Sequence, residues 1–218
     1  DRWKTILSGL GNTVLITLAA ILIGLAIGTI IALIKVSYTN SAKPNILLKI
    51  LNAVATLYLT IIRGTPVLVQ LLILYYSILS SGTSSLTAAM IGFGINSGAY
   101  VAEIVRSGIM SINKGQMEAG RSLGLNYAAT MRYIIIPQAI KNILPALGNE
   151  LITLLKETSI CTVIGLMDLT KGAMIVQSRT YAPWMPYLSI AVIYLVMVLV
   201  LTKLLGILER RLRASDQR

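Results

Sequence analysis

Three long stretches of the chain carry no charged side chain: Thr5–Ile34, Gly64–Ala102 and Thr180–Thr202. A helix needs about 20 apolar residues to cross the hydrocarbon of a bilayer, so each stretch is long enough to span it. The first stretch is longer than a signal-peptide core of about 7–15 residues, and no small-residue cleavage site ends it. The pattern therefore predicts an all-α, polytopic membrane protein.

Five transmembrane helices fit this pattern, near residues 10–34, 46–79, 86–110, 142–164 and 187–207. The second range is too long for one simple crossing, because a helix of that length measures about 50 Å against a hydrocarbon thickness of about 30 Å. It is either one long, partly interfacial helix interrupted at Arg-Gly-Thr-Pro (63–66) or two separate crossings.

The distribution of Lys and Arg distinguishes these two topologies. With one crossing, segments 35–49, 104–141 and 203–218 share a side and hold three, five and five basic residues, whereas the other side holds four. Cytoplasmic segments carry an excess of Lys and Arg. The count favours five spans, with the N-terminus outside and the C-terminus in the cytoplasm. The chain begins at Asp1 and not at Met, which leaves room for a preceding N-terminal segment.

Composition excludes several classes of protein. With 56% apolar and 12% charged residues, the chain cannot form an ordinary soluble domain. It has no histidine and a single cysteine, which argues against a metal site, a disulfide framework and histidine-based catalysis. No phosphate-binding loop of the G-x-x-x-x-G-K-[ST] type occurs. The net charge of +11 is better explained by membrane topology than by nucleic-acid binding.

One compact polar segment, EAGRSLGLNYAATMRYIIIP (118–137), lies on the predicted cytoplasmic side. Helix-forming residues run up to Gly124, which suits the left-handed position that ends a helix. Asn126 can cap a second helix. The segment is therefore expected to form a helix–Gly–helix hairpin, which either docks on a partner protein or lies on the lipid surface.

Ionisable residues inside spans usually face the bundle interior or a water-filled path. Arg63 and Glu103 border the second uncharged stretch, and Glu150, Lys156 and Glu157 fall in the fourth span. Arg63 and Glu103 either bind substrate or form an internal ion pair. Glu150 is more typical of a structural residue.

Two further patterns bear on packing. Residues 24–28 (GLAIG) and 94–98 (GINSG) have the G-x-x-x-G spacing that lets helices approach closely. A lipid-facing position or packing within the chain is favoured over a subunit interface. Asn96, Tyr100 and Glu103 can share one helix face. Asp168 and Lys171 are expected on the outer face of the membrane, in contact with solvent or with a binding protein.

The polar segment resembles the EAA loop of ABC-importer permeases, whose pattern is E-A-A, three residues, Gly, nine residues and I-x-L-P. Glu118, Ala119, Gly124, Ile134 and Pro137 stand at these intervals. Gly120 replaces the usual Ala, which weakens the helix by up to about 1 kcal/mol, and Ile136 replaces the usual Leu. RGTPVLVQ (63–70), SGAYVAEIVRSGI (97–109) and LLKETSI (154–160) resemble the polar-amino-acid branch of these permeases.

This resemblance implies a type I importer fold, with one transmembrane domain over residues 1–218 and a coupling loop at about 111–141. It implies a permease subunit, without enzymatic activity or a cofactor of its own, in the plasma membrane of a prokaryote. The implied partners are two cytoplasmic ATPase subunits that hold ATP and Mg, a second permease chain and an external solute-binding protein. A second copy of this chain is favoured over a different permease.

The implied cargo is a polar amino acid. Glu103 and Glu157 favour basic side chains, although Arg63 and Lys156 could neutralise both. The candidate residues for substrate binding are Arg63, Gly64, Thr65, Asn96, Tyr100, Glu103, Glu157, Thr158 and Ser159. The residues expected to couple the chain to the ATPase are Glu118, Ala119, Gly120, Arg121, Ser122, Leu123 and Gly124. The alternative is a channel-forming or structural membrane protein, for which the hairpin would have no evident use.

Overall fold

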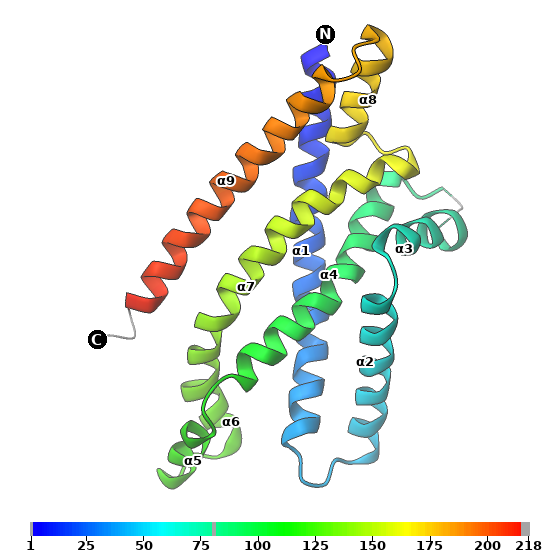
Figure 1. Cartoon of the computed structure of the whole chain (residues 1–218). Helices are drawn as coiled ribbons and strands as arrows, with labels where there is room; N and C mark the ends of the chain where they lie inside the picture. Colours follow the sequence, from blue (N-terminus) through cyan, green and yellow to red (C-terminus); the bar gives the residue numbers. More distant parts are fainter. Residues whose placement is uncertain (1, 80–81, 215–218) are drawn as a thin grey trace.

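The computed structural model describes residues 2–79 and 82–214, with side chains up to residue 212. Within this part all regular elements are helical (Figure 1). The α-helices are α1 (Arg2–Asn40), α2 (Ile46–Gly64), α3 (Val67–Ile73), α4 (Ser85–Met110), α5 (Lys114–Ser122), α6 (Tyr127–Thr130), α7 (Ile136–Glu157), α8 (Leu169–Thr180) and α9 (Met185–Ala214). The π-helical segment η1 (Leu74–Ile78) extends α3, and a second one, η2 (Met131–Ile135), lies between α6 and α7. The 3-10 segment η3 (Thr158–Ile164) follows α7.

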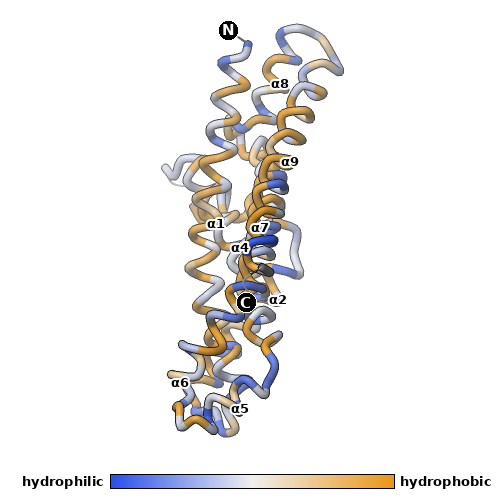
Figure 2. The backbone as a smooth tube through the Cα atoms, turned by 90° about the vertical axis from the view of Figure 1, so that its left-hand side faces the viewer, coloured by the Kyte–Doolittle hydropathy of each residue, from blue (hydrophilic) through white to orange (hydrophobic). Residues whose placement is uncertain are grey.

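The long helices run up and down the length of the molecule (Figure 1). In the described part, α1, α2, α4 and α9 are each long and apolar enough to cross a membrane. A fifth span is formed if Tyr127–Ile164 and Leu169–Thr180, which meet at a bend of 52°, count as one broken span. Hydrophobic residues predominate along α1 and α9, and hydrophilic ones lie around α5 and at mid-height beside α4 and α7 (Figure 2). The prediction of about five transmembrane helices is confirmed.

The second predicted span contains a break. Helix α2 ends at Gly64, and Thr65 and Pro66 have extended backbones with ψ of 148° and 135°. Proline disfavours a helical conformation in the residue before it, and it lacks the N–H that would continue the helix. The chain then runs sideways through α3 before α4 starts back (Figure 1). The segment Val67–Ile78 is too short to span the bilayer, so the range 46–79 crosses once.

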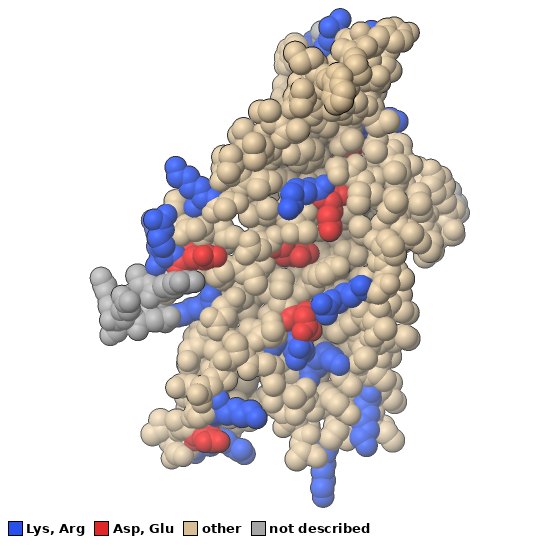
Figure 3. Space-filling model, in the orientation of Figure 1, with Lys and Arg blue, Asp and Glu red and all other residues tan. Residues whose placement is uncertain are grey.

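Segments 35–49 and 104–141 lie at the same end of the molecule, as the single crossing requires. The side-chain amide of Asn40, at the end of α1, donates a hydrogen bond of 3.2 Å to the hydroxyl of Tyr127 in α6. Basic atoms are prominent at this end (Figure 3). Helix α9, which leads into the third predicted basic segment (203–218), runs back from the opposite end (Figure 1). The side chains of the last two basic residues of this segment, Arg213 and Arg218, lie outside the described part.

Helices α1 and α4 form the most extensive helix–helix contact of the described chain. A Cβ atom at Gly24 would lie 2.9 Å from the Ser97 hydroxyl, and one at Gly28 would lie 2.7 Å from Val101. On the opposing helix, a Cβ at Gly94 would lie 2.6 Å from Ile23. The two G-x-x-x-G patterns therefore pack against one another within the chain, as expected.

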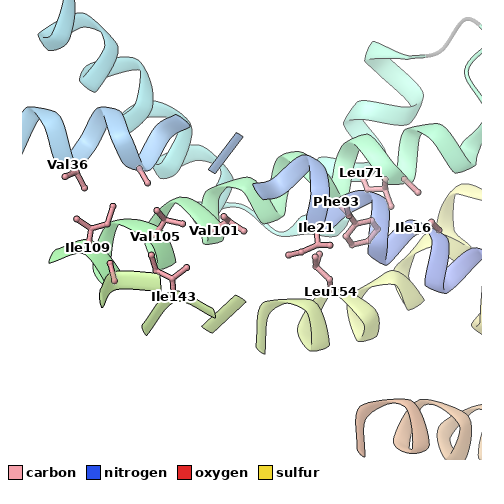
Figure 4. Close-up of a cluster of buried hydrophobic side chains, with 14 of the residues drawn as sticks. Ile16, Ile21, Val36, Leu71, Phe93, Val101, Val105, Ile109, Ile143 and Leu154 are labelled. Carbon is pink, nitrogen blue, oxygen red and sulfur yellow. The ribbon is translucent and has the colours of Figure 1, made fainter. Parts of the chain in front are cut away.

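The main hydrophobic core extends from this contact (Figure 4). Ile16 and Ile21 of α1 and Phe93 of α4 pack beside Leu71 of α3 and Leu154 of α7. In contrast, α2 and α9 bury only a small part of their apolar spans, 11% each. These two helices present most of their surface to lipid or to other chains.

The outer segment around Asp168 differs from expectation. Asp168 is fully buried, and its carboxylate caps α8 by accepting hydrogen bonds from the backbone N–H groups of Thr170 and Lys171 at 3.1 and 2.9 Å. The prediction that Asp168 contacts solvent or a binding protein is wrong, because its side chain is buried. Four unsatisfied N–H groups begin every helix, and α8 draws this carboxylate inward to satisfy two of them. Asn12 of α1 secures the same segment by donating to the carbonyl of Met167 at 2.7 Å.

The close approach of α1 and α4 predicts unequal effects for two identical substitutions in one helix. Gly28→Val is expected to destabilise the protein by about 1–3 kcal/mol, because the added atoms overpack against Val101. Gly11→Val is the matched control, since nothing lies within 4 Å of a Cβ at Gly11. Thermal unfolding of the purified protein in detergent measures both. Equal midpoints for the two variants would contradict the tight α1–α4 contact.

Candidate functional site

The polar hairpin consists of α5 and α6, joined at Gly124. Gly124 has φ of +81°, the left-handed conformation predicted for it. The N–H groups of Gly124 and Leu125 donate to the carbonyls of Arg121 and Gly120 at 2.9 and 3.1 Å, which is the Schellman pattern of a helix end. Asn126 caps α6 by accepting from the N–H of Ala129 at 2.9 Å. Both predicted boundaries of the hairpin are confirmed.

Gly120, which stands where the EAA pattern usually has Ala, has a role in packing that the sequence pattern did not indicate. It is buried, and a Cβ there would lie 2.5 Å from Thr130 Cγ2 and 2.9 Å from Thr130 Oγ1. Thr130 is fully buried and donates its hydroxyl to the carbonyl of Asn126 at 3.0 Å. Gly120 therefore lets α6 pack directly on α5.

The tip and the inner side of the hairpin differ in character. Leu123 is 79% exposed beside the turn. Behind α5, a cavity of about 330 Å³ separates the hairpin from the ends of α1 and α4. Lys114, Glu118 and Arg121 line it together with apolar residues of α4 and η2. The hairpin is therefore a protruding element with an apolar tip, and a charged side of α5 faces the cavity.

A second group of polar residues surrounds the corner between α2 and α3. Arg63 lies 3.9 Å from the carboxylate of Glu103, and its guanidinium lies 5.7 Å from the ring centre of Tyr100. Arg106, one turn after Glu103 on α4, donates two hydrogen bonds to the same carboxylate, one of them 3.1 Å long. The expected Arg63–Glu103 pair exists, but Arg106 holds Glu103 more closely. The i, i+3 spacing of Glu103 and Arg106 could have identified this partner from the sequence.

Gln70 of α3, which sequence reasoning also missed, bridges this corner to α4. Its amide nitrogen donates to the carbonyls of Ile62 and Thr65 at 2.8 and 3.0 Å and to the Thr65 hydroxyl at 2.8 Å. Its amide oxygen accepts a hydrogen bond of 2.9 Å from Asn96. Asn96 is only 3% exposed. Asn96, Tyr100 and Glu103 thus share a face of α4 that meets the α2–α3 corner, with Asn96 beneath its surface.

Helix α7 contributes a polar stripe. The exposed residues Asn142, Asn149, Thr153 and Lys156 recur at intervals of about one or two helical turns, so they lie on one side of the helix. Three of these four, Asn142, Asn149 and Thr153, were not predicted from the sequence as candidates, although their helical spacing could have indicated them. Figure 3 shows acidic and basic atoms on the face over which α4 and α7 run.

Glu150 lies beside this stripe and accepts a hydrogen bond of 2.8 Å from the buried Ser97 of α4. Glu157 is half-buried, next to the exposed Lys156. Thr158 is fully buried and donates to the carbonyl of Leu155 at 2.8 Å, and Ser159 is half-buried in η3. The structure therefore brings Arg63, Tyr100 and Glu103 together at one surface, and it places Asn96 and Thr158 below the surface.

The remaining two candidates form the corner itself. Gly64 has no atom within 4 Å of the position of a Cβ, and the Thr65 hydroxyl donates to the carbonyl of Ile61 at 2.8 Å. Polar side chains on a membrane-spanning surface are costly in lipid and mark pathways or interfaces. The face defined by Arg63, Tyr100, Glu103, Thr153 and Lys156, here called the polar face, is therefore the part of the spans best suited to contact a polar solute.

The chain has relatives among known proteins. Residues 24–214 match the sequence model of a family described as binding-protein-dependent transport system inner membrane component. The chain is 40% identical over 214 residues to the arginine transport system permease protein ArtQ of Bacillus subtilis, covering 97% of this chain and 94% of ArtQ. It is 40% identical over 168 residues to the glutamine transport system permease protein GlnP of Escherichia coli, covering 75% and 77% of the two chains.

Solved structures show the same fold. A crystal structure of an amino acid ABC transporter with histidines includes a chain that superposes with a TM-score of 0.87 at 49% identity, covering 95% of this chain and 94% of that one. A chain of the MetNI methionine ABC transporter in an inward-facing conformation gives a TM-score of 0.75 at 21% identity, covering 97% and 96%. The second likeness bears on the fold alone.

The contact between Gly120 and Thr130 predicts a compensating pair of substitutions. Gly120→Ala is expected to loosen the hairpin, because the added methyl group collides with Thr130. Adding Thr130→Ala should restore protection, with a coupling of about 0.5–3 kcal/mol between the two positions. Hydrogen exchange of the backbone amides in 114–135 measures the effect. Independent, additive losses of protection in the double variant would show that the two residues do not form this contact.

Proposed function

Because the chain belongs to the family of binding-protein-dependent transport system inner membrane components, we propose that it is the permease subunit of an ABC importer for polar amino acids. The chain itself provides the path across the membrane, and a partner subunit hydrolyses ATP and holds the nucleotide and Mg. The relatives named above for arginine and glutamine transport support this class of cargo.

The observation that carries this proposal is the polar face. Tyr100 is 39% exposed and the Arg63 side chain 44% exposed, each on a helix that crosses the membrane. Exposed charged and polar groups on a span need water, substrate or another chain as neighbours. One chain with this face on its outside cannot enclose a solute, so we propose that two permease chains, here two copies of this one, face each other across the path.

The charges of the polar face suit a zwitterion. Around Glu103, two guanidinium groups accompany one carboxylate, and Arg106 satisfies that carboxylate by two hydrogen bonds. Arg63 is thus the cation available for the α-carboxylate of a substrate, which a guanidinium can bind in bidentate fashion. Glu157 is the acidic group proposed for a substrate ammonium or a basic side chain. Basic amino acids remain the favoured cargo because Glu157 can accept their extra charge.

The hairpin is proposed to dock into a cytoplasmic ATPase. Leu123 at its tip and the left-handed Gly124 give it the shape of an insert for an apolar pocket. In this proposal the α5 end of the molecule lies in the cytoplasm and the N-terminal end of α1 lies outside, where a solute-binding protein would deliver the substrate. A channel-forming protein is the second candidate, but a protruding hairpin of this form has no role in ion gating.

The polar stripe of α7 predicts the site of transport. Thr153→Leu should lower uptake of labelled arginine and glutamine by about tenfold or more, since it replaces a polar wall of the path with an apolar one. Thr202→Leu on the lipid-facing α9 is the matched control, because Thr202 is also exposed on a span. Vesicles that contain the permease, its ATPase and its binding protein provide the measurement. Equal uptake by the two variants would place the path elsewhere.

The hairpin predicts a separate effect on coupling. Gly124→Val forces a β-branched residue into left-handed geometry, at a cost of about 1–2 kcal/mol, and Glu118→Lys reverses a charge on α5. Both variants should insert into the membrane but lose ATP-driven uptake or ATPase binding. Gly206→Val on α9 is the control, since nothing lies within 4 Å of a Cβ there. Co-purification and uptake are the readouts, and parental uptake by both hairpin variants would refute the coupling role.

A further inference from the structure

We propose that Gln70 is a positioning residue for substrate binding. Its side-chain amide, held by the buried Asn96, fixes the last turn of α2 and so places Arg63 at the polar face. This inference rests on the proposed role of Arg63 as the group that binds the substrate carboxylate. Gln70 itself lies behind that surface, half-buried on α3, and needs no contact with substrate.

The first step is the need for a cap at the end of α2. The last four carbonyl groups of a helix have no partner within it, and in a membrane such groups cannot turn to bulk water. The Thr65 hydroxyl donates a hydrogen bond to the carbonyl of Ile61, and the Gln70 amide donates one to the carbonyl of Ile62. Gln70 also donates to the carbonyl of Thr65, which lies beyond the helix end. One side chain therefore holds the backbone on both sides of Arg63.

The second step is the anchor of Gln70 itself. A glutamine side chain has several rotatable bonds, so a cap made by it alone would be loose. Asn96 removes this freedom, because its own side chain is buried in α4 and donates to the Gln70 oxygen at 2.9 Å. The donor and acceptor ends of the Gln70 amide are both engaged. The last turn of α2 is thereby tied to α4, the helix that carries Glu103 and Tyr100.

The third step concerns Arg63. Its contacts with α4 are a long ion pair of 3.9 Å and a stacking distance of 5.7 Å, both at a partly exposed surface. Exposed ion pairs contribute little to holding a helix in place. The position of the guanidinium thus depends on the backbone beneath it, and that backbone is set by Gln70. Loosening this turn should misplace the guanidinium without removing it.

The experiment measures the dissociation constant of labelled arginine from the purified permease–ATPase complex. Gln70→Leu keeps side-chain bulk but removes every hydrogen bond, and it is expected to weaken binding about tenfold, the effect of roughly one well-placed hydrogen bond. Gln177→Leu on α8 is the matched control and should bind as the parent does. If Gln70→Leu does not assemble, Gln70→Met carries the same test, because it keeps the length of the side chain.

A double-variant cycle distinguishes positioning from a general structural role. If Gln70 acts through Arg63, then Gln70→Leu should weaken binding by less than about twofold once Arg63→Ala is present. Additive losses, or failure of both Gln70 variants to assemble, would overturn the inference. Unchanged binding in Gln70→Leu with weakened binding in Arg63→Ala would also overturn it and leave the proposed function intact. Unchanged binding in Arg63→Ala would instead remove the proposed substrate site itself.

Discussion

The close contact between α1 and α4 is the constraint on which the other parts of this molecule depend. Lipid tails are as apolar as the helix surfaces, so no hydrophobic force drives these helices together, and packing must hold them. Gly24 and Gly28 permit an approach in which a single added Cβ would collide with Ser97 or Val101. Ser97 is thereby sealed between α1 and α7, where its hydroxyl can reach Glu150. The contact fixes α4 at the centre, and α4 carries the polar residues toward both of its neighbours.

Helix α2 is attached to this centre in a different way. It buries one residue, Ala55, and side-chain hydrogen bonds join it to α1 and α4. The hydroxyl of Tyr58 donates to the carbonyl of Ile95, and Lys35 of α1 donates to the Thr56 hydroxyl at 2.9 Å. Directional bonds fix the rotation of a helix without requiring a large buried area. The position of the corner after α2 is therefore more sensitive to single polar substitutions than the position of α1 or α4.

The sequence was sufficient for the approximate positions of the spans, the single crossing of residues 46–79 and the form of the hairpin, because each depends on local signals. Uncharged length predicts a span, and Gly124 and Asn126 predict the ends of α5 and α6. The sequence was insufficient where a residue has more than one possible partner in the folded chain. The sequence offered Arg63 and, by its i, i+3 spacing, Arg106 as partners for Glu103, and the folded chain shows that Arg106 lies closer. Asp168 looked like a surface charge, but its burial depends on α1, which lies more than 150 residues earlier in the chain.

The hairpin and the polar face are connected by the same two helices. Helix α4 leads into α5, and α6 continues through η2 into α7, which begins at Ile136. At their bases the two helices are joined by a hydrogen bond of 2.9 Å from the Asn142 amide to the Ser111 hydroxyl. Farther along, they are joined by the bond between Ser97 and Glu150. The hairpin is therefore joined at its two ends to α4 and α7, the helices that carry the two sides of the polar face.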